Sequence, residues 1–171
     1  MNLIPKLQSS HWQCKGSKAE LICDDVPLMQ INFKRRPAKV EVPGHHWQII
    51  KERFWCSALS VVENDKVILS QKQIGFWGNK HEILIEDRRY FAKIRQRMHI
   101  AIAYSNETED VLEYRLNGFL RKPRFIFNIK AASISENDLL LLLAVGLYSI
   151  RRTVNEYNAA VVTTAIVAAG I

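Results

Sequence analysis

Apolar and polar residues alternate with a period of two along most of the chain up to about residue 130. In one such run Tyr90, Ala92 and Ile94 fall on one face of a strand, and Lys93 and Arg95 fall on the other. Side chains of a half-buried β-strand point alternately to opposite faces, so these runs predict strands. Turn-forming clusters separate the runs at Pro43-Gly44, Glu63-Asn64-Asp65, Gly78-Asn79, Glu86-Asp87-Arg88, Ser105-Asn106-Glu107 and Asn117-Gly118.

A large apolar residue also recurs at a nearly constant interval of about 21–22 residues, which is typical of one supersecondary unit used repeatedly. The recurring residues are Trp12, Phe33, Phe54, Phe76, Met98 and Phe119. Each interval has room for two short strands and two turns. Six units over about residues 11–130 therefore predict about twelve strands in an up-and-down order. Because open edges of so long a sheet would aggregate, we expect a roughly twelve-stranded closed antiparallel barrel.

The pattern changes in the last quarter of the chain, where residues 135–138 have the composition of a helix capping box. Residues 139–150 then carry almost no polar side chain, and Arg151 and Arg152 follow, where cations suit the end of a helix dipole. A helix that is apolar on every side must be buried on every side, and a wide barrel has a lumen to fill. We therefore expect a core helix over about residues 136–152 that plugs the barrel.

A second apolar run, residues 159–171, is rich in Ala and Val and carries no charged side chain. It is shorter than the roughly 20 residues of a membrane span. An exposed apolar strip is unfavourable, so we expect this tail to pack on the barrel or on a second copy of the chain. Membrane insertion is the remaining alternative. Residues 1–171 then form a single domain.

The formal net charge of +7 favours polyanionic partners such as anionic lipid headgroups, nucleic acid or an acidic protein. Cys14, Cys23 and Cys56 form no metal-binding or redox pair by spacing, and the first residues lack the apolar stretch of a signal peptide. We therefore expect a cytoplasmic protein that is peripheral to the membrane.

The strand-rich repeats, the basic aromatic-led turns and the terminal apolar helix together resemble the tubby C-terminal-like superfamily. This superfamily includes the tubby domain, the phospholipid scramblases and the LURP-one-related proteins. The likeness is closest to small bacterial stand-alone members, whose chains end in a Leu-rich helix followed by arginines, as residues 138–152 do here. The resemblance covers roughly residues 11–152 and implies a twelve-stranded barrel around a central helix.

The same resemblance says less about ligands. Tubby domains bind phosphoinositides through basic surface residues, but this chain offers no residue-by-residue match to that site. Scramblases have an acidic calcium-binding segment near the terminal helix, whereas residues 151–158 here contain Glu156 as their one carboxylate. The resemblance therefore implies no calcium dependence, and the tail from Ala159 onward departs from the family pattern.

Catalytic and metal-binding motifs are missing from the sequence. There is no nucleophile elbow, P-loop or dinucleotide fingerprint. The histidines do not stand at metal-ligand spacing from one another or from carboxylates; they are His11, His45, His46, His81 and His99. We therefore expect neither enzymatic activity nor a cofactor or metal ion.

Clusters of cations are the best functional lead. The candidate anion- or lipid-binding residues are Lys34, Arg35, Arg36, Lys93, Arg95, Arg97, Arg121, Lys122 and Arg124. A basic turn beside an aromatic ring suits a headgroup interface, since the ring lies among headgroups while the cations meet phosphate. The alternative is that these cations are solvated and keep strand edges from pairing.

The sequence thus predicts a non-enzymatic binding module for anionic phospholipid or a membrane surface. The alternative is a structural or protein-interaction domain that forms a homo-oligomer through its apolar tail. Nucleic acid is the least favoured partner, because binding by a barrel usually needs exposed aromatic rings on a strand face. Phe91, beside Lys93 and Arg95, is the one hint of such a ring.

Overall fold

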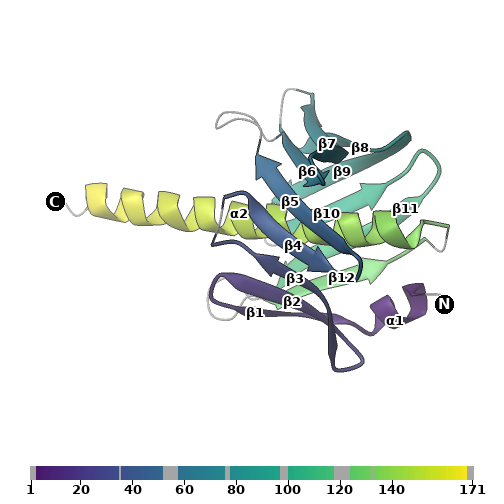
Figure 1. The fold of residues 1–171 in the computed structure, drawn as a ribbon. Coiled ribbons are helices and arrows are strands. Elements are labelled where there is room, and N and C mark those ends of the chain that lie inside the picture. Colours follow the sequence, from purple (N-terminus) through teal and green to yellow (C-terminus); the bar gives the residue numbers. More distant parts are fainter. Residues whose placement is uncertain are drawn as a thin grey trace.

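The computed structural model describes residues 3–34, 36–51, 58–75, 78–96, 100–117, 124–131 and 133–168, and of residues 96 and 156–168 it describes the backbone alone. It contains two helices and twelve strands within these residues (Figure 1). The helices are α1 (Ile4–Gln8) and α2 (Glu136–Ala168). The strands are β1 (His11–Lys15), β2 (Lys18–Cys23), β3 (Val26–Asn32), β4 (Ala38–Val42), β5 (His45–Lys51), β6 (Leu59–Glu63), β7 (Lys66–Ile74), β8 (Lys80–Ile85), β9 (Arg88–Gln96), β10 (Ile100–Ser105), β11 (Asp110–Asn117) and β12 (Arg124–Ile129).

Each strand pairs antiparallel with the next one along the chain, which gives a single twelve-stranded sheet in the order β1 to β12. The sheet curls until β1 approaches β12, so the barrel is nearly closed. Trp12 of β1 helps to bridge this seam, because its indole nitrogen donates a hydrogen bond to the Tyr114 hydroxyl on β11 at 2.9 Å. The predicted fold class and strand number are confirmed.

Tight turns with left-handed backbone join several strand pairs. Asn64 and Asp65 have φ values of 49° and 62°, and Asp24 and Asp25 have values of 49° and 61°. Two consecutive positive φ angles match the twist of a two-residue hairpin, and Asn and Asp tolerate them better than other non-glycine residues. The turn predicted at residues 63–65 is thereby confirmed.

Of the repeat residues, Trp12 is buried in β1 and Phe33 follows β3, whereas Phe54, Phe76, Met98 and Phe119 lie outside the described residues.

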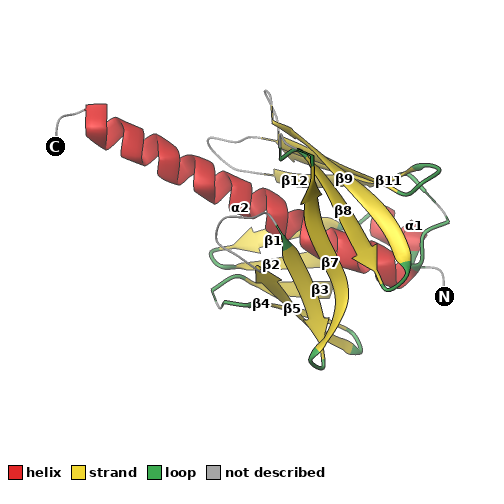
Figure 2. Ribbon diagram, turned by 90° about the horizontal axis from the view of Figure 1, so that it is seen from above, coloured by secondary structure: helices red, strands yellow, loops and turns green. Residues whose placement is uncertain are grey.

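The first half of α2 runs through the inside of the barrel, as the views in Figures 1 and 2 show from two directions. Leu139, Leu141, Leu143 and Leu147 are fully buried against the inward-facing strand residues. Burying one such side chain contributes about 1.5–3 kcal/mol to folding, so this helix supplies a large part of the core. The predicted plug is therefore confirmed.

The helix does not end at Arg151 and Arg152, as the sequence pattern suggested. It continues without a break for 33 residues to Ala168. The physical reason is that no Gly or Pro stands between Gly146 and Gly170, so nothing interrupts the backbone hydrogen bonds. From residue 159 on, the helix projects away from the strands and does not fold back along the barrel wall (Figures 1 and 2).

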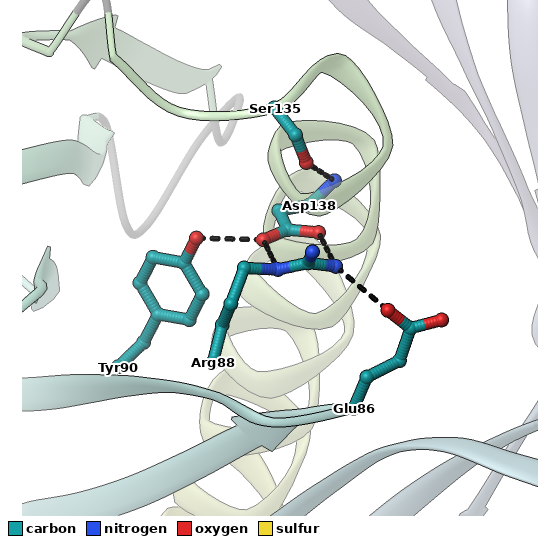
Figure 3. A network of polar contacts seen from close by, with 5 residues as sticks. All are labelled: Glu86, Arg88, Tyr90, Ser135 and Asp138. Carbon is teal, nitrogen blue, oxygen red and sulfur yellow. Dashed lines mark hydrogen bonds and ion pairs between the residues drawn. The ribbon is translucent and has the colours of Figure 1, made fainter.

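A polar network fixes the start of α2 to the barrel (Figure 3). The buried carboxylate of Asp138 accepts bonds from the Arg88 guanidinium at 2.7 and 3.0 Å and from the Tyr90 hydroxyl at 2.6 Å. The Ser135 hydroxyl accepts a bond from the Asp138 backbone N–H at 3.1 Å, which is the capping interaction that the sequence predicts. Arg88 also contacts Glu86 at 3.1 Å. Because every polar atom of the Asp138 carboxylate is paired, this network orients the plug.

Candidate anionic-surface interface

The up-and-down order of the strands decides which turns share an end of the barrel. Turns that follow odd-numbered strands lie at one end, and turns that follow even-numbered strands lie at the other. We call the end with the β1–β2 turn, Gly16-Ser17, the exit end, because α2 leaves the barrel there. The Arg151 guanidinium, on α2, donates a hydrogen bond to the Gly16 carbonyl at this end. The opposite end, with the turn Asp24-Asp25 and the start of α2, is the far end.

Exposed cations gather at the exit end. We call nine of them the basic collar: Lys15, Lys18, Lys34, Arg36, Lys39, Lys80, Lys93, Arg95 and Arg124. The strand register places them there. Lys15 lies opposite Lys18, Lys80 opposite Lys93, and Arg124 opposite the last residue of β11.

Carboxylates gather at the far end instead. They lie in or beside its turns: Asp24, Asp25, Glu63, Asp65, Glu86, Asp87, Glu107, Glu109 and Asp110. Several cations at the far end are neutralised locally, because Lys6 pairs with Asp24 at 3.7 Å and Lys130 pairs with Asp110 at 3.1 Å. The barrel is therefore polarised along its axis, with positive charge at the end from which the helix emerges.

The basic collar carries positive charge that the described part of the chain does not compensate. Over the described residues, no carboxylate lies within ion-pair distance of any collar side chain. The neighbouring Lys72 differs, because it pairs with Glu82 at 2.8 Å, and Arg89 reaches the same carboxylate at 3.2 Å. These two cations hold the pKa of Glu82 below its ordinary value, chiefly through the bond from Lys72.

The structure brings the described members of the predicted site to one end of the barrel. Lys34 and Arg36 lie in the β3–β4 connection, Lys93 and Arg95 lie on the outer face of β9, and Arg124 begins β12. All five are exposed. The other predicted members lie outside the described residues: Arg35, Arg97, Arg121 and Lys122.

The sequence interpretation missed four members of the basic collar, Lys15, Lys18, Lys39 and Lys80. Each stands at or next to the end of a strand, and none is directly adjacent to another cation in the sequence. The sequence did contain a signal, because among the turns that the structure describes the acidic ones follow even-numbered strands. Reading the charge of alternate turns would have shown the polarity before the structure did.

Arg151 was also misinterpreted from the sequence, as a residue at the end of the helix. Its guanidinium carbon lies 4.3 Å from the centre of the Phe33 ring, within cation–π distance. The Phe33 ring stacks on Tyr148 of α2, with centroids 6.3 Å apart and planes 16° apart. Together with the bond to Gly16, these contacts fix α2 to the strands at the level where it leaves the barrel.

A buried histidine lies near the same end. His81 of β8 is 1% exposed, and neither ring nitrogen makes a hydrogen bond of normal geometry. Burial lowers its pKa, the backbone of Gly78 opposes that shift, and the charge of Arg152 adds to it. Among the described residues no group of His, Cys, Asp and Glu side chains could hold a metal ion, and His81 has no partner for that role.

No family model matches the chain, and no curated protein or solved structure shows significant similarity to it. Over the described residues, neither helix combines the length and the hydropathy that a membrane span requires.

Proposed function

We propose that this protein is a non-enzymatic module that binds the surface of an anionic phospholipid membrane through its basic collar. The observation that carries this proposal is the segregation of charge along the barrel axis. Each cation near an anionic bilayer contributes on the order of 1 kcal/mol, so several collar residues acting together are sufficient for binding. The acidic far end would be repelled by the same surface, and this repulsion orients the molecule.

The distribution of the basic collar favours an extended partner over a small one. Its members come from two separate parts of the barrel wall: one extends from β12 across the seam to β4, and the other consists of β8 and β9. A single phosphate group can contact a few of these side chains, whereas a planar anionic surface can meet many of them.

Nucleic acid is also a polyanion, but two features favour the membrane. Phe91 shares the outer face of β9 with Lys93 and Arg95, but it is half-buried and offers little ring surface for base stacking. The continuation of α2 also leaves the barrel on the side of the basic collar, where it would obstruct a nucleic-acid backbone.

We also propose that the chain belongs to the tubby C-terminal-like superfamily. Support comes from the twelve-stranded order, the near-closure of the barrel and the helix that fills it. The described basic collar gives no residue-by-residue correspondence to the phosphoinositide site of tubby domains, so the lipid proposal rests on charge distribution alone.

Vesicle co-sedimentation tests the proposal. Vesicles of phosphatidylcholine alone should leave the protein in solution, and vesicles with added phosphatidylserine should sediment it. Lys80→Glu should weaken binding at least about tenfold, because it replaces one favourable charge by a repulsive one. Lys66→Glu is the matched control, since Lys66 also begins a strand and is exposed, but lies at the far end.

Three results would contradict the proposal. They are equal binding to neutral and anionic vesicles, equal weakening by Lys80→Glu and Lys66→Glu, and tighter binding of a DNA or RNA oligonucleotide than of anionic vesicles. The last result would identify nucleic acid, and not a membrane, as the binding partner.

A further inference from the structure

The continuation of α2 beyond the barrel needs a partner of its own. Exposure rises along this helix: Leu147 is fully buried, Val154 is half-buried and Asn155 is exposed. The backbone then remains helical to Ala168 and projects away from every strand (Figures 1 and 2). We call residues 156–168 the helix extension.

The helix extension has the composition of a membrane-inserting segment in its outer part. From Ala159 to Ala168 it contains only Ala, Val, Ile and Thr, and no charged side chain. Its inner part is polar, with Glu156 and Asn158, and Arg151 and Arg152 come just before it. A sequence that passes from cations through polar residues to apolar residues matches the passage from headgroups to hydrocarbon.

We propose that the outer part of the helix extension inserts into one leaflet of the anionic membrane that the basic collar contacts. This inference rests on the proposed function and adds an apolar contribution to the electrostatic one. Ten helical residues span about 15 Å, which is half of a hydrocarbon core about 30 Å thick. The described segment therefore reaches into one leaflet without crossing it.

The contacts of Arg151 at the point where α2 leaves the barrel allow the inserted helix to orient the whole molecule. Arg151 is held by the Phe33 ring and by the Gly16 carbonyl, so the helix leaves the barrel in a fixed direction. The inserted helix and the basic collar then face the same surface, and the barrel stands end-on with its acidic end pointing away from the membrane.

A second copy of the chain is the competing partner for the helix extension. Pairing two copies through these segments would bring two positively charged exit ends near each other. Uncompensated like charges oppose such an approach, whereas an anionic surface neutralises them. The charge of the basic collar therefore favours the bilayer.

Vesicle flotation at two salt concentrations separates the insertion from the electrostatic binding. At about 1 M sodium chloride the Debye length falls to about 3 Å, which screens the collar but leaves apolar insertion intact. We expect the unaltered protein to remain on anionic vesicles at this salt concentration. Val162→Asp should make binding releasable by salt and at least about tenfold weaker at low salt, because a carboxylate is costly in hydrocarbon.

Val67→Asp is the matched control, since it adds the same charge at a 55% exposed position near the far end and should leave flotation unchanged. Release of the unaltered protein by high salt, or equal flotation of Val162→Asp and the unaltered protein, would overturn the insertion while leaving the proposed function standing. A dimer detected by light scattering without vesicles and abolished by Val162→Asp would assign the helix extension to a second copy. Absence of binding to anionic vesicles at low salt would overturn both proposals.

Discussion

The ring of Tyr114 lies so close to Gly146 that a Cβ atom on that glycine would stand 2.5 Å from Cε2 of the ring. Tyr114 is held in place on both sides, because its hydroxyl donates to the Leu143 carbonyl at 2.6 Å and accepts from Trp12 at 2.9 Å. The absence of a side chain at Gly146 therefore lets α2 lie close to the Tyr114 ring of β11.

Gly146→Ala should destabilise the protein. Helix propensity alone would favour Ala by about 1 kcal/mol, but overpacking a well-filled core costs about 1–3 kcal/mol. Since the Tyr114 ring cannot retreat without losing its hydrogen bonds, we expect the overpacking cost to exceed the helix-propensity gain, with a net loss of up to about 2 kcal/mol in urea unfolding. Ser149→Ala, on the half-buried part of the same helix, should change stability by less than about 0.5 kcal/mol. A higher melting temperature for Gly146→Ala would show that the ring moves aside freely.

Asp138→Asn should weaken the attachment of α2 at the far end. Removing one partner of a buried ion pair typically lowers the free energy of unfolding by about 3–5 kcal/mol. Because the Arg88 side chain is 45% exposed, we expect a loss near the lower end of this range. Asp110→Asn is the control, since it breaks an exposed pair with Lys130 and should cost less than about 1 kcal/mol. Denaturant unfolding of the two variants checks the difference, and equal losses would contradict the structural role of the Asp138 network.

Alkaline pH should destabilise the barrel through its buried phenols. Burial raises the pKa of Tyr90, Tyr104 and Tyr114, and the Asp138 carboxylate raises the pKa of Tyr90 further. Above pH of about 10 the unfolded chain releases these protons while the folded chain keeps them, so stability falls as pH rises, by about 1.4 kcal/mol per pH unit for each phenol.

Unfolding free energies at a series of pH values from about 9 to 12 would show this slope. Tyr90→Phe should make the slope shallower, because one phenol no longer contributes to it. An unchanged slope in that variant would contradict the assignment of Tyr90.

Acid should destabilise the same barrel through His81. Burial and the nearby charge of Arg152 lower the pKa of this imidazole in the folded state. As pH falls below about 6.5 the unfolded chain binds a proton that the folded chain does not, so stability is lost on the acid side. His81→Leu should flatten the dependence between about pH 7 and pH 5 in denaturant unfolding. A variant that keeps the full acid dependence would show that another group is responsible.

The sequence alone determined the number of strands, their up-and-down order and the existence of a buried helix. These features depend on the local spacing of apolar residues and on turn-forming residues. Examples are the alternating apolar and polar residues of β9, the two-residue turn at Asn64-Asp65, and the apolar side chains on every side of residues 139–147. Such patterns need no knowledge of distant contacts, because a strand or helix must match its burial to its own geometry. Part of the candidate interface was found in the same way, since Lys34, Arg36, Lys93, Arg95 and Arg124 stand in basic clusters along the chain.

Only the tertiary structure decided how these parts meet. Gly146 looks like a weak position in a helix until the Tyr114 ring is placed against it, and Arg151 looks like the end of a helix until Phe33 lies beneath it. Lys15 and Lys80 join Arg124 in one collar because closing the barrel brings residues from distant strands to one end. The side-chain contacts between α2 and the strands depend on residues that are far apart in the sequence, so no window along the chain contains them.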